Sequence, residues 1–171
     1  MIFGVLLASL FWNGNLVQCN KQEIIEDLKN IIFKIKKSGD FGAGQTSIPA
    51  FTATLSKDFT PPLNQIIKFD SVKTNVGGHY SSSTGVFTPP RNGLYMISAT
   101  IRSTATKYLH CELWVNDVMK EKLFGNNYST GTANAVLQLK RGDRVFIKKD
   151  NRSGEYMLGR DWSMFSGYFI A

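Results

Sequence analysis

From Ile48 to the end of the chain, short runs of alternating apolar and polar residues are separated by turn residues. The runs "LYMISATIRS" (94–103) and "YLHCELWVN" (108–116) place an apolar or small residue at every second position, which is typical of strands that bury one face. The runs "AFTATLS" (50–56) and "QIIKF" (65–69) are expected to be strands as well. Because no long helical pattern lies between the runs, the spacing predicts an antiparallel sandwich or barrel of about eight to ten strands.

The first residues, "MIFGVLLASLFW", form an apolar run without a charged side chain. The run is too short to span a bilayer and has the length of the apolar core of a signal peptide. Val17 and Cys19 suit the −3 and −1 positions of a cleavage site, which predicts a signal peptide at residues 1–19 and secretion to the extracellular space. A buried N-terminal helix is the alternative interpretation.

The chain has 171 residues and a net charge of +7, and the predicted signal peptide carries none of that charge. A secreted protein this basic favours anionic partners such as acidic polysaccharides, lipopolysaccharide or sulfated glycans. The extracellular compartment argues against nucleic acid. Cleavage after Cys19 leaves Cys111 as the one cysteine of the mature chain, so no intramolecular disulfide is expected.

Residues 20–38 contain one amphipathic helical pattern. The main apolar stripe consists of Ile24, Leu28, Ile31 and Ile35. A helix this short needs a packing partner, and isoleucine at both seam positions favours a coiled coil of three or four copies. Docking onto its own domain and lying on a membrane surface are the alternatives. A glycine-rich linker is predicted at residues 39–47, before a head domain at residues 48–171.

The segment "GVFTPPRNGLYMISATI" (85–101) is expected to turn a corner between two strands. Pro89 and Pro90 cannot donate hydrogen bonds to a ladder, so the strand with Phe87 must end before them. Asn92 and Gly93 tolerate positive φ and precede the next strand. The role of this segment is therefore predicted to be architectural.

A spaced signature overlaps this corner. Its members are Phe69, Asn75, Tyr80, Phe87, Gly93 and Tyr95. In these positions and spacings the chain resembles the C1q globular-head family, as do "LKRGDRVFI" (139–147) and "FSGYFI" (165–170). The family's next two aromatic positions are occupied here by Ile97 and Ala99, which keep an inward apolar face.

The resemblance implies an all-β fold, a ten-stranded jelly-roll β-sandwich of the C1q/TNF type, preceded here by the short helix. It also implies a compact homotrimer that binds ligands and is not an enzyme. The layout is similar to short secreted C1q-domain proteins that act in innate immunity as lectin-like pattern-recognition molecules.

The residues themselves offer no catalytic set. The two histidines are His79, expected in a solvated loop, and His110, whose neighbour Cys111 must point to the opposite face of the strand. Cys111 shares its face with apolar residues and is expected to be buried. No metal-binding spacing occurs, although calcium remains possible through loop carboxylates that converge. The candidate carboxylates are Asp117, Glu121, Asp143, Asp150 and Asp161.

The candidate ligand-binding residues are basic and lie in one loop: Lys148, Lys149 and Arg152. Two further basic corners are formed by the pairs Lys140–Arg141 and Arg102–Lys107. Trp114 and Trp162 can stack on sugar rings, although tryptophan more often lies in a core or an interface. Two sequons place candidate glycosylation sites at Asn127 and Asn151.

The first functional hypothesis is multivalent recognition of microbial or anionic polysaccharides. The second is a cytokine-like or adhesive ligand of a host cell-surface receptor. The third is a structural protein of the extracellular matrix that associates with calcium; the basic charge argues against it.

Overall fold

The computed structural model describes residues 21–37 and 47–171. The predicted signal peptide (1–19) and nearly all of the predicted linker (39–47) lie outside these residues, as does the side chain of Ile35. Contacts divide the chain into two units, residues 1–45 and 46–171.

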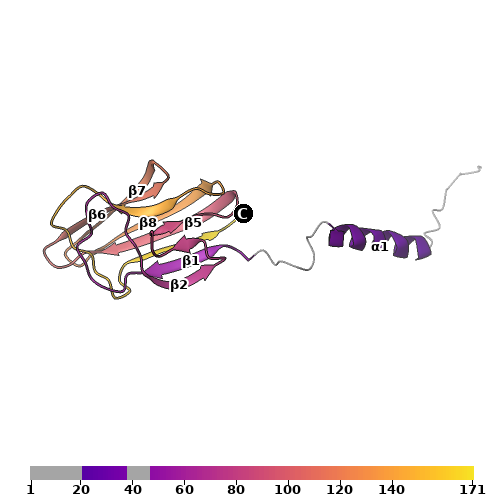
Figure 1. Cartoon of the computed structure of the whole chain (residues 1–171), viewed down its shortest axis with the longest axis horizontal. Helices are drawn as coiled ribbons and strands as arrows, with labels where there is room; N and C mark the ends of the chain where they lie inside the picture. Colours follow the sequence, from indigo (N-terminus) through magenta and orange to yellow (C-terminus); the bar gives the residue numbers. More distant parts are fainter. Residues whose placement is uncertain (1–20, 38–46) are drawn as a thin grey trace, which may run out of the picture. The chain divides into compact units, whose positions relative to one another are not determined.

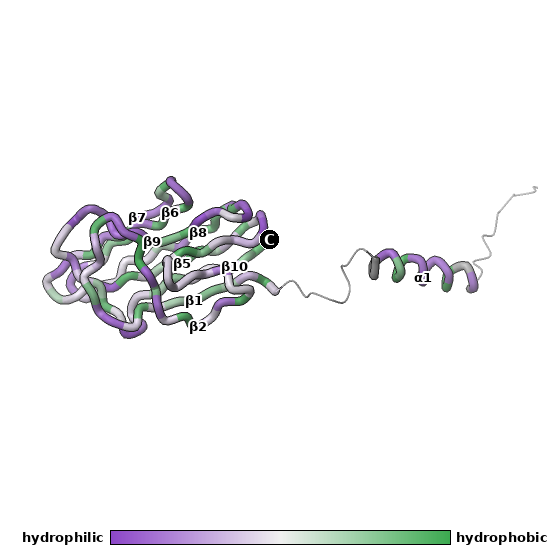
Figure 2. Tube along the Cα trace, viewed as in Figure 1, coloured by the Kyte–Doolittle hydropathy of each residue, from purple (hydrophilic) through white to green (hydrophobic). Residues whose placement is uncertain are grey.

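The first unit contains helix α1 (Lys21–Lys37), which confirms the helical pattern. Apolar and polar residues alternate along α1 with the period of a helix (Figure 2). Its described apolar side chains, Ile24, Ile25, Leu28, Ile31, Ile32 and Phe33, are all exposed. Within the described parts of the chain, no helix is long and apolar enough to cross a membrane.

The second unit is a sandwich of ten strands, in which all pairs of neighbouring strands are antiparallel (Figure 1). The strands are β1 (Ala50–Thr54), β2 (Ser71–Val76), β3 (Tyr80–Ser81), β4 (Val86–Phe87), β5 (Gly93–Arg102), β6 (Tyr108–Val115), β7 (Val118–Asn126), β8 (Thr130–Leu139), β9 (Val145–Lys149) and β10 (Met164–Phe169). One five-stranded sheet has the order β2-β1-β10-β5-β8, and the other has the order β3-β4-β9-β6-β7.

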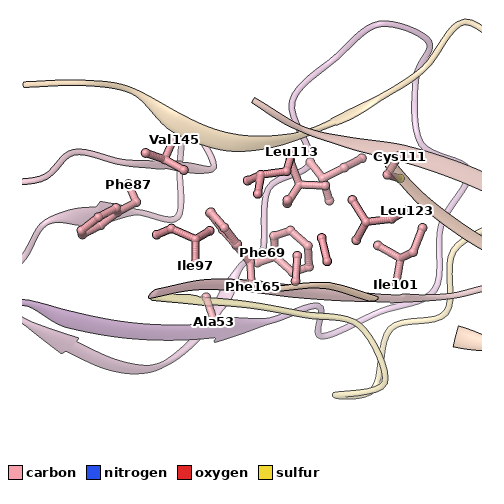
Figure 3. Packing of buried hydrophobic residues seen from close by; sticks show 14 of the residues in the cluster. Ala53, Phe69, Phe87, Ile97, Ile101, Cys111, Leu113, Leu123, Val145 and Phe165 are labelled. Atoms are coloured by element: carbon pink, nitrogen blue, oxygen red, sulfur yellow. The ribbon is translucent and has the colours of Figure 1, made fainter. Parts of the chain in front are cut away.

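The alternation along β5 and β6 sets the inner faces of the two sheets, as predicted. Residues of β5 such as Tyr95 and Ile97 are fully buried, and so are Leu109 and Leu113 of β6. Figure 3 shows apolar side chains from both sheets, among them Ile97 and Leu113, meeting in the space between the sheets. Aromatic rings fill the centre, where Phe51 lies 4.6 Å from Phe87 and 4.9 Å from Phe165, measured between ring centroids.

The structure corrects one expected strand. Residues 65–69 do not form a strand, and Ile66 makes only an isolated bridge to Lys148. This segment borders β9 where the short strand β4 no longer pairs with it, and Ile67 N donates to Ile147 O at 2.8 Å. The contact with β9 is too short for a regular ladder.

The segment with the two prolines is a corner, as predicted, and it joins the two sheets. Strand β4 ends at Phe87 in one sheet, and β5 begins at Gly93 in the other. Gly93 has a φ of 152°, and a Cβ there would lie 2.4 Å from Ala171 O. Glycine is therefore required where the C-terminal residue crosses the start of β5.

Candidate functional site

The outward face of β6 carries polar and aromatic side chains in alternation with its buried ones. These outward residues are Tyr108, His110, Glu112 and Trp114. Tyr108 is 60% exposed, while the other three are half-buried. The Trp114 indole Nε1 donates to Glu112 Oε2 at 2.9 Å, which orients both side chains along the strand.

Strand pairing surrounds this row with partners from β7 and β9. Phe124 of β7 lies directly opposite His110, with ring centroids 4.7 Å apart. Glu112 lies between two lysines, since its register partners are Lys122 in β7 and Lys148 in β9. The Lys148 ammonium lies 4.8 Å from the centroid of the Trp114 ring, within the range of a cation–π contact.

The sequence predicts that three basic residues bind a ligand, and this prediction is wrong for Lys149. Its side chain is 1% exposed, because Lys149 continues the inward alternation of Val145 and Ile147 along β9. Its ammonium forms ion pairs with Asp150 and, at 2.8 Å, with Glu155 Oε2. Lys149 is therefore a structural cation and offers no charge to a ligand.

Glu155 connects this buried pair to β6. The Glu155 carboxylate accepts from His110 N at 2.7 Å and lies 2.5 Å from His110 Nδ1. With 6% of its side chain exposed, Glu155 ties the loop of residues 150–155 to β6. Burial raises the pKa of Asp150, but the hydrogen bond from Lys149 and the contacts with Arg152 outweigh it, so the pKa lies below its ordinary value.

Lys148 and Arg152, in contrast, face solvent and line one hollow. Two hollows of about 590 and 440 Å³ adjoin on this face, and both are lined by His110, Phe124 and Arg152. Tyr108 and Lys107 belong to the larger hollow, whereas Trp114, Lys122 and Lys148 belong to the smaller one. We call the two hollows together the β6–β7 groove.

Among the residues of this groove that sequence reasoning missed are Tyr108, His110, Phe124 and Glu155. The alternation of "YLHCELWVN" already placed Tyr108 and His110 outward. Phe124 and Glu155 enter through strand register and loop packing, which local patterns do not carry.

The other predicted basic residues lie apart from the groove, except Lys107. Arg102 packs on the exposed Trp162, with its guanidinium 3.9 Å from the ring centroid, and donates to Tyr128 O at 3.0 Å. Lys140 and Arg141 are exposed in the β8–β9 turn. Trp114 and Trp162, the two tryptophans considered for stacking on sugars, thus each lie against a cation.

The carboxylates considered for calcium do not converge in the described residues, where no group of three metal-binding side chains occurs. Asp143 accepts from the backbone N of Lys140 at 2.8 Å, and Asp161 binds Thr54 and Lys73. The pKa of Asp161 is lowered by the hydrogen bonds from Thr54 and Lys73. Asp143, Asp150 and Asp161 are thus engaged in turns and ion pairs.

Cys111 is buried, as expected from its position in β6. Burial raises the pKa of the thiol strongly, and the nearby Lys149 only partly offsets that effect. His110 lies on the other face of the strand, as predicted, and pairs with Glu155. A nucleophile activated by histidine is therefore not formed at this point.

The spaced signature has a structural explanation in this chain. Tyr80 OH accepts from Phe69 N at 3.1 Å and donates to Phe69 O at 3.0 Å, deep in the core. Burial raises the pKa of Tyr80 well above its ordinary value. Phe87 and Tyr95 are fully buried, with ring centroids 5.8 Å apart.

Both candidate glycosylation sites are exposed. Asn127 lies in the β7–β8 turn with a φ of 43°. Asn151 lies in the loop after β9 and lines the smaller hollow of the β6–β7 groove.

Two five-stranded antiparallel sheets with this strand order form a jelly-roll sandwich of the C1q/TNF type. Residues 50–170 match the C1q domain family. The chain therefore belongs to the C1q domain family, and the resemblance inferred from the signature is confirmed.

Two relatives have the same level of identity. One, from Mus musculus, is a subunit of the complement C1q subcomponent and is 32% identical over 122 residues, which cover 70% of this chain and 49% of that protein. Caprin-2 of Danio rerio is 32% identical over 127 residues, which cover 71% of this chain and 14% of that protein. The chain thus matches half or less of the length of these relatives.

Solved structures support the fold. The globular domain of zebrafish complement 1qA matches with a TM-score of 0.62 and 22% identity, covering 73% of this chain and 98% of that one. Eiger TNF of S. frugiperda matches with a TM-score of 0.61 and 15% identity, covering 72% and 93%. At these identities the likeness concerns the fold, which is the predicted ten-stranded sandwich. The C1q/TNF-like family is non-enzymatic.

Proposed function

We propose that this protein is secreted, assembles as a homotrimer and acts as a multivalent, lectin-like recognition protein for microbial or other anionic polysaccharides. Membership in the C1q domain family is the observation that carries the proposal. One relative is, by its name, part of a complement component. Secretion is proposed from the apolar run at residues 1–12 together with this relationship.

Two features of the chain support an anionic, repeated ligand. The net charge of +7 attracts polyanions at long range. A trimer presents each weak binding patch three times, and such multivalency raises avidity by about 10² to 10⁴ without new contacts.

The test uses residues 20–171, expressed without N-glycans and with the mass of the assembly measured by light scattering. Binding is measured to immobilised polygalacturonate, lipopolysaccharide and neutral dextran, with a salt series and with free sugar as competitor. We expect binding to polyanions that weakens with salt and is displaced by sugar. Absence of binding by a confirmed trimer contradicts the polysaccharide proposal and favours the alternative, a cytokine-like or adhesive ligand of a cell-surface receptor.

The exposed stripe of α1 allows a separate test of its part in assembly. Leu28→Glu places a charge in the stripe, whereas Lys34→Glu on the same helix is the control. If α1 forms a coiled coil, only the first substitution lowers the assembled mass or the temperature at which the trimer dissociates. An unchanged mass and dissociation temperature for both variants contradicts the coiled coil.

A further inference from the structure

We propose that the β6–β7 groove binds an acidic sugar residue, with the apolar face of the sugar ring on Phe124 and Tyr108 and its anionic group beside Arg152. This inference rests on the proposed function and adds to it the chemistry and the location of the ligand. Four features of the groove support the proposal: exposed rings, hydrogen-bonding groups, cations and a rigid support.

The first feature is an exposed aromatic platform. Phe124 is 47% exposed and Tyr108 is 60% exposed, yet the two rings lie nearly parallel, with an interplanar angle of 23° and centroids 6.1 Å apart. The axial C–H bonds of a pyranose form an apolar face with slight positive charge, which complements the negative face of an aromatic ring. His110, 4.7 Å from Phe124, extends the platform toward β9.

The second feature is the hydrogen bonding of His110 and Glu112. The Glu155 carboxylate accepts hydrogen bonds only, so Nδ1 of His110 carries the hydrogen in their 2.5 Å contact. No described residue is bonded to Nε2, so this nitrogen is left for a ligand. Sugar hydroxyls both donate and accept, so they can bind Nε2 whether the ring is neutral or charged, and they can donate to Glu112 Oε1.

The third feature is the positive charge around the hollows. Arg152 uses one guanidinium nitrogen for its ion pair with Asp150 and keeps its side chain 58% exposed, so further donors remain for an anionic group. Lys107 borders the larger hollow beside Arg152, while Lys122 and Lys148 border the smaller one. Basic residues thus rim the hollows on both sides of the aromatic platform.

The fourth feature is the rigid support of His110 and Arg152. Glu155 binds both the backbone and the ring of His110, and Lys149 joins Glu155 to Asp150. Asp150 in turn binds the backbone N of Arg152 at 3.0 Å and its guanidinium. This buried network positions Arg152 and His110 before a ligand arrives, which reduces the entropy lost on binding.

Stacking rings and cations also occur in sites for single-stranded nucleic acid. Here the Glu112 carboxylate lies among the cations; it repels a phosphodiester backbone, and that backbone offers it no hydrogen-bond donors. Sugar hydroxyls supply such donors. The mixture therefore favours an acidic glycan, from a microbial or a host source, over a polynucleotide.

The experiment measures binding of residues 20–171 to polygalacturonate, dextran sulfate, neutral dextran and oligothymidylate. The variants are Phe124→Ala and Arg152→Gln. Their matched controls are Val118→Ala and Arg160→Gln, two exposed positions that line neither hollow; Arg160, like Arg152, forms an ion pair with an aspartate, Asp58. We expect each groove variant to lose about tenfold or more in affinity for the acidic polymers, which corresponds to about 1.4 kcal/mol, and the controls to lose less than about twofold.

A second measurement reads the groove directly. In a Trp162→Phe background, Trp114 is the remaining tryptophan of residues 20–171, and it lines the smaller hollow. Addition of galacturonate oligomers is expected to change Trp114 fluorescence with the same concentration dependence as binding. A change that survives in the Phe124→Ala variant at equal concentration contradicts the proposed site.

The outcomes separate the two proposals. If the parent protein binds acidic polymers and Phe124→Ala binds them equally well, the groove is the wrong site while the proposed function stands. If the parent protein binds no polysaccharide, both proposals fail. Equal affinity for neutral dextran, or a preference for oligothymidylate, overturns the assignment of an acidic sugar.

Discussion

The side chain of Asn75 and the backbone of Tyr80 exchange two hydrogen bonds across the turn between β2 and β3. Asn75 Nδ2 donates to Tyr80 O at 2.9 Å, and Tyr80 N donates to Asn75 Oδ1 at 3.1 Å. The turn contains Gly77 and Gly78, both at positive φ, and Gly78 N also donates to Asn75 O at 3.2 Å. One amide side chain thus replaces a strand partner for both backbone groups of Tyr80.

Replacement of Asn75 is therefore expected to loosen this turn. Asn75→Ala removes both bonds and should lower the free energy of unfolding by about 1–2 kcal/mol. Asn75→Asp keeps the acceptor for Tyr80 N but sets a second carboxylate oxygen against Tyr80 O, so it should lower the midpoint as well. Urea denaturation of the three proteins measures the difference, and equal midpoints for Ala and Asn would show that the turn holds without this side chain.

Tyr80→Phe is expected to destabilise the core although it removes a single oxygen. The hydroxyl satisfies both Phe69 N and Phe69 O, which are buried and would lose their partner. The expected cost is about 1–3 kcal/mol in the free energy of unfolding, measured by denaturation. Tyr168→Phe, at an exposed ring of β10, is the control and should change the midpoint little.

Lys149→Met tests the role of the buried cation. The substitution keeps the shape of the side chain but leaves Asp150 and Glu155 facing each other without a cation between them. Asp150 keeps Arg152 and Glu155 keeps His110 as partners, so the two carboxylates lose only part of their compensation. Removal of one partner from a buried ion pair costs about 3–5 kcal/mol, and a clear fall in the unfolding midpoint is therefore expected. Lys148→Met, one residue earlier and partly exposed, is the matched control. Similar midpoints for the two variants would refute a structural role for Lys149.

Acid should weaken the loop that borders the groove. The pKa of Asp150 is lower in the folded protein than its ordinary value of 3.8, so the unfolded chain takes up this proton first as pH falls. The stabilisation is fully present above pH 3.8 and is lost as pH falls from there through the folded value. Thermal unfolding between pH 6 and pH 2 should show a steeper loss for the parent protein than for Asp150→Asn.

Cys111 should be unreactive toward thiol reagents in the folded protein. It is 1% exposed, and burial raises its pKa, so very little thiolate is present at neutral pH. In residues 20–171, which contain this one cysteine, a disulfide reagent such as dithionitrobenzoate should react slowly in buffer and fully in denaturant. Rapid reaction in buffer would mean that the region around Cys111 opens frequently.

Local patterns predicted the secondary structure well where one face of an element is buried. The alternation in β5 and β6 is formed as predicted. The predicted strand at residues 65–69 is absent because its short contact with β9 depends on how far β4 extends, and alternation does not encode that length. The prediction that Lys149 binds a ligand is wrong because it relied on the charge of the side chain and not on its inward position in the alternation of β9.

The candidate site divides in the same way. Sequence alone determined an all-β head after a helix, the corner between the sheets and the C1q signature, because these depend on residue order and on the period of two. Tertiary structure decided which charges are buried and which side chains gather in the groove. Phe124 meets His110 through strand register, and Glu155 reaches His110 from 45 positions further along the chain. Such contacts depend on packing between distant segments, since each residue taken by itself is an ordinary member of its own strand or loop.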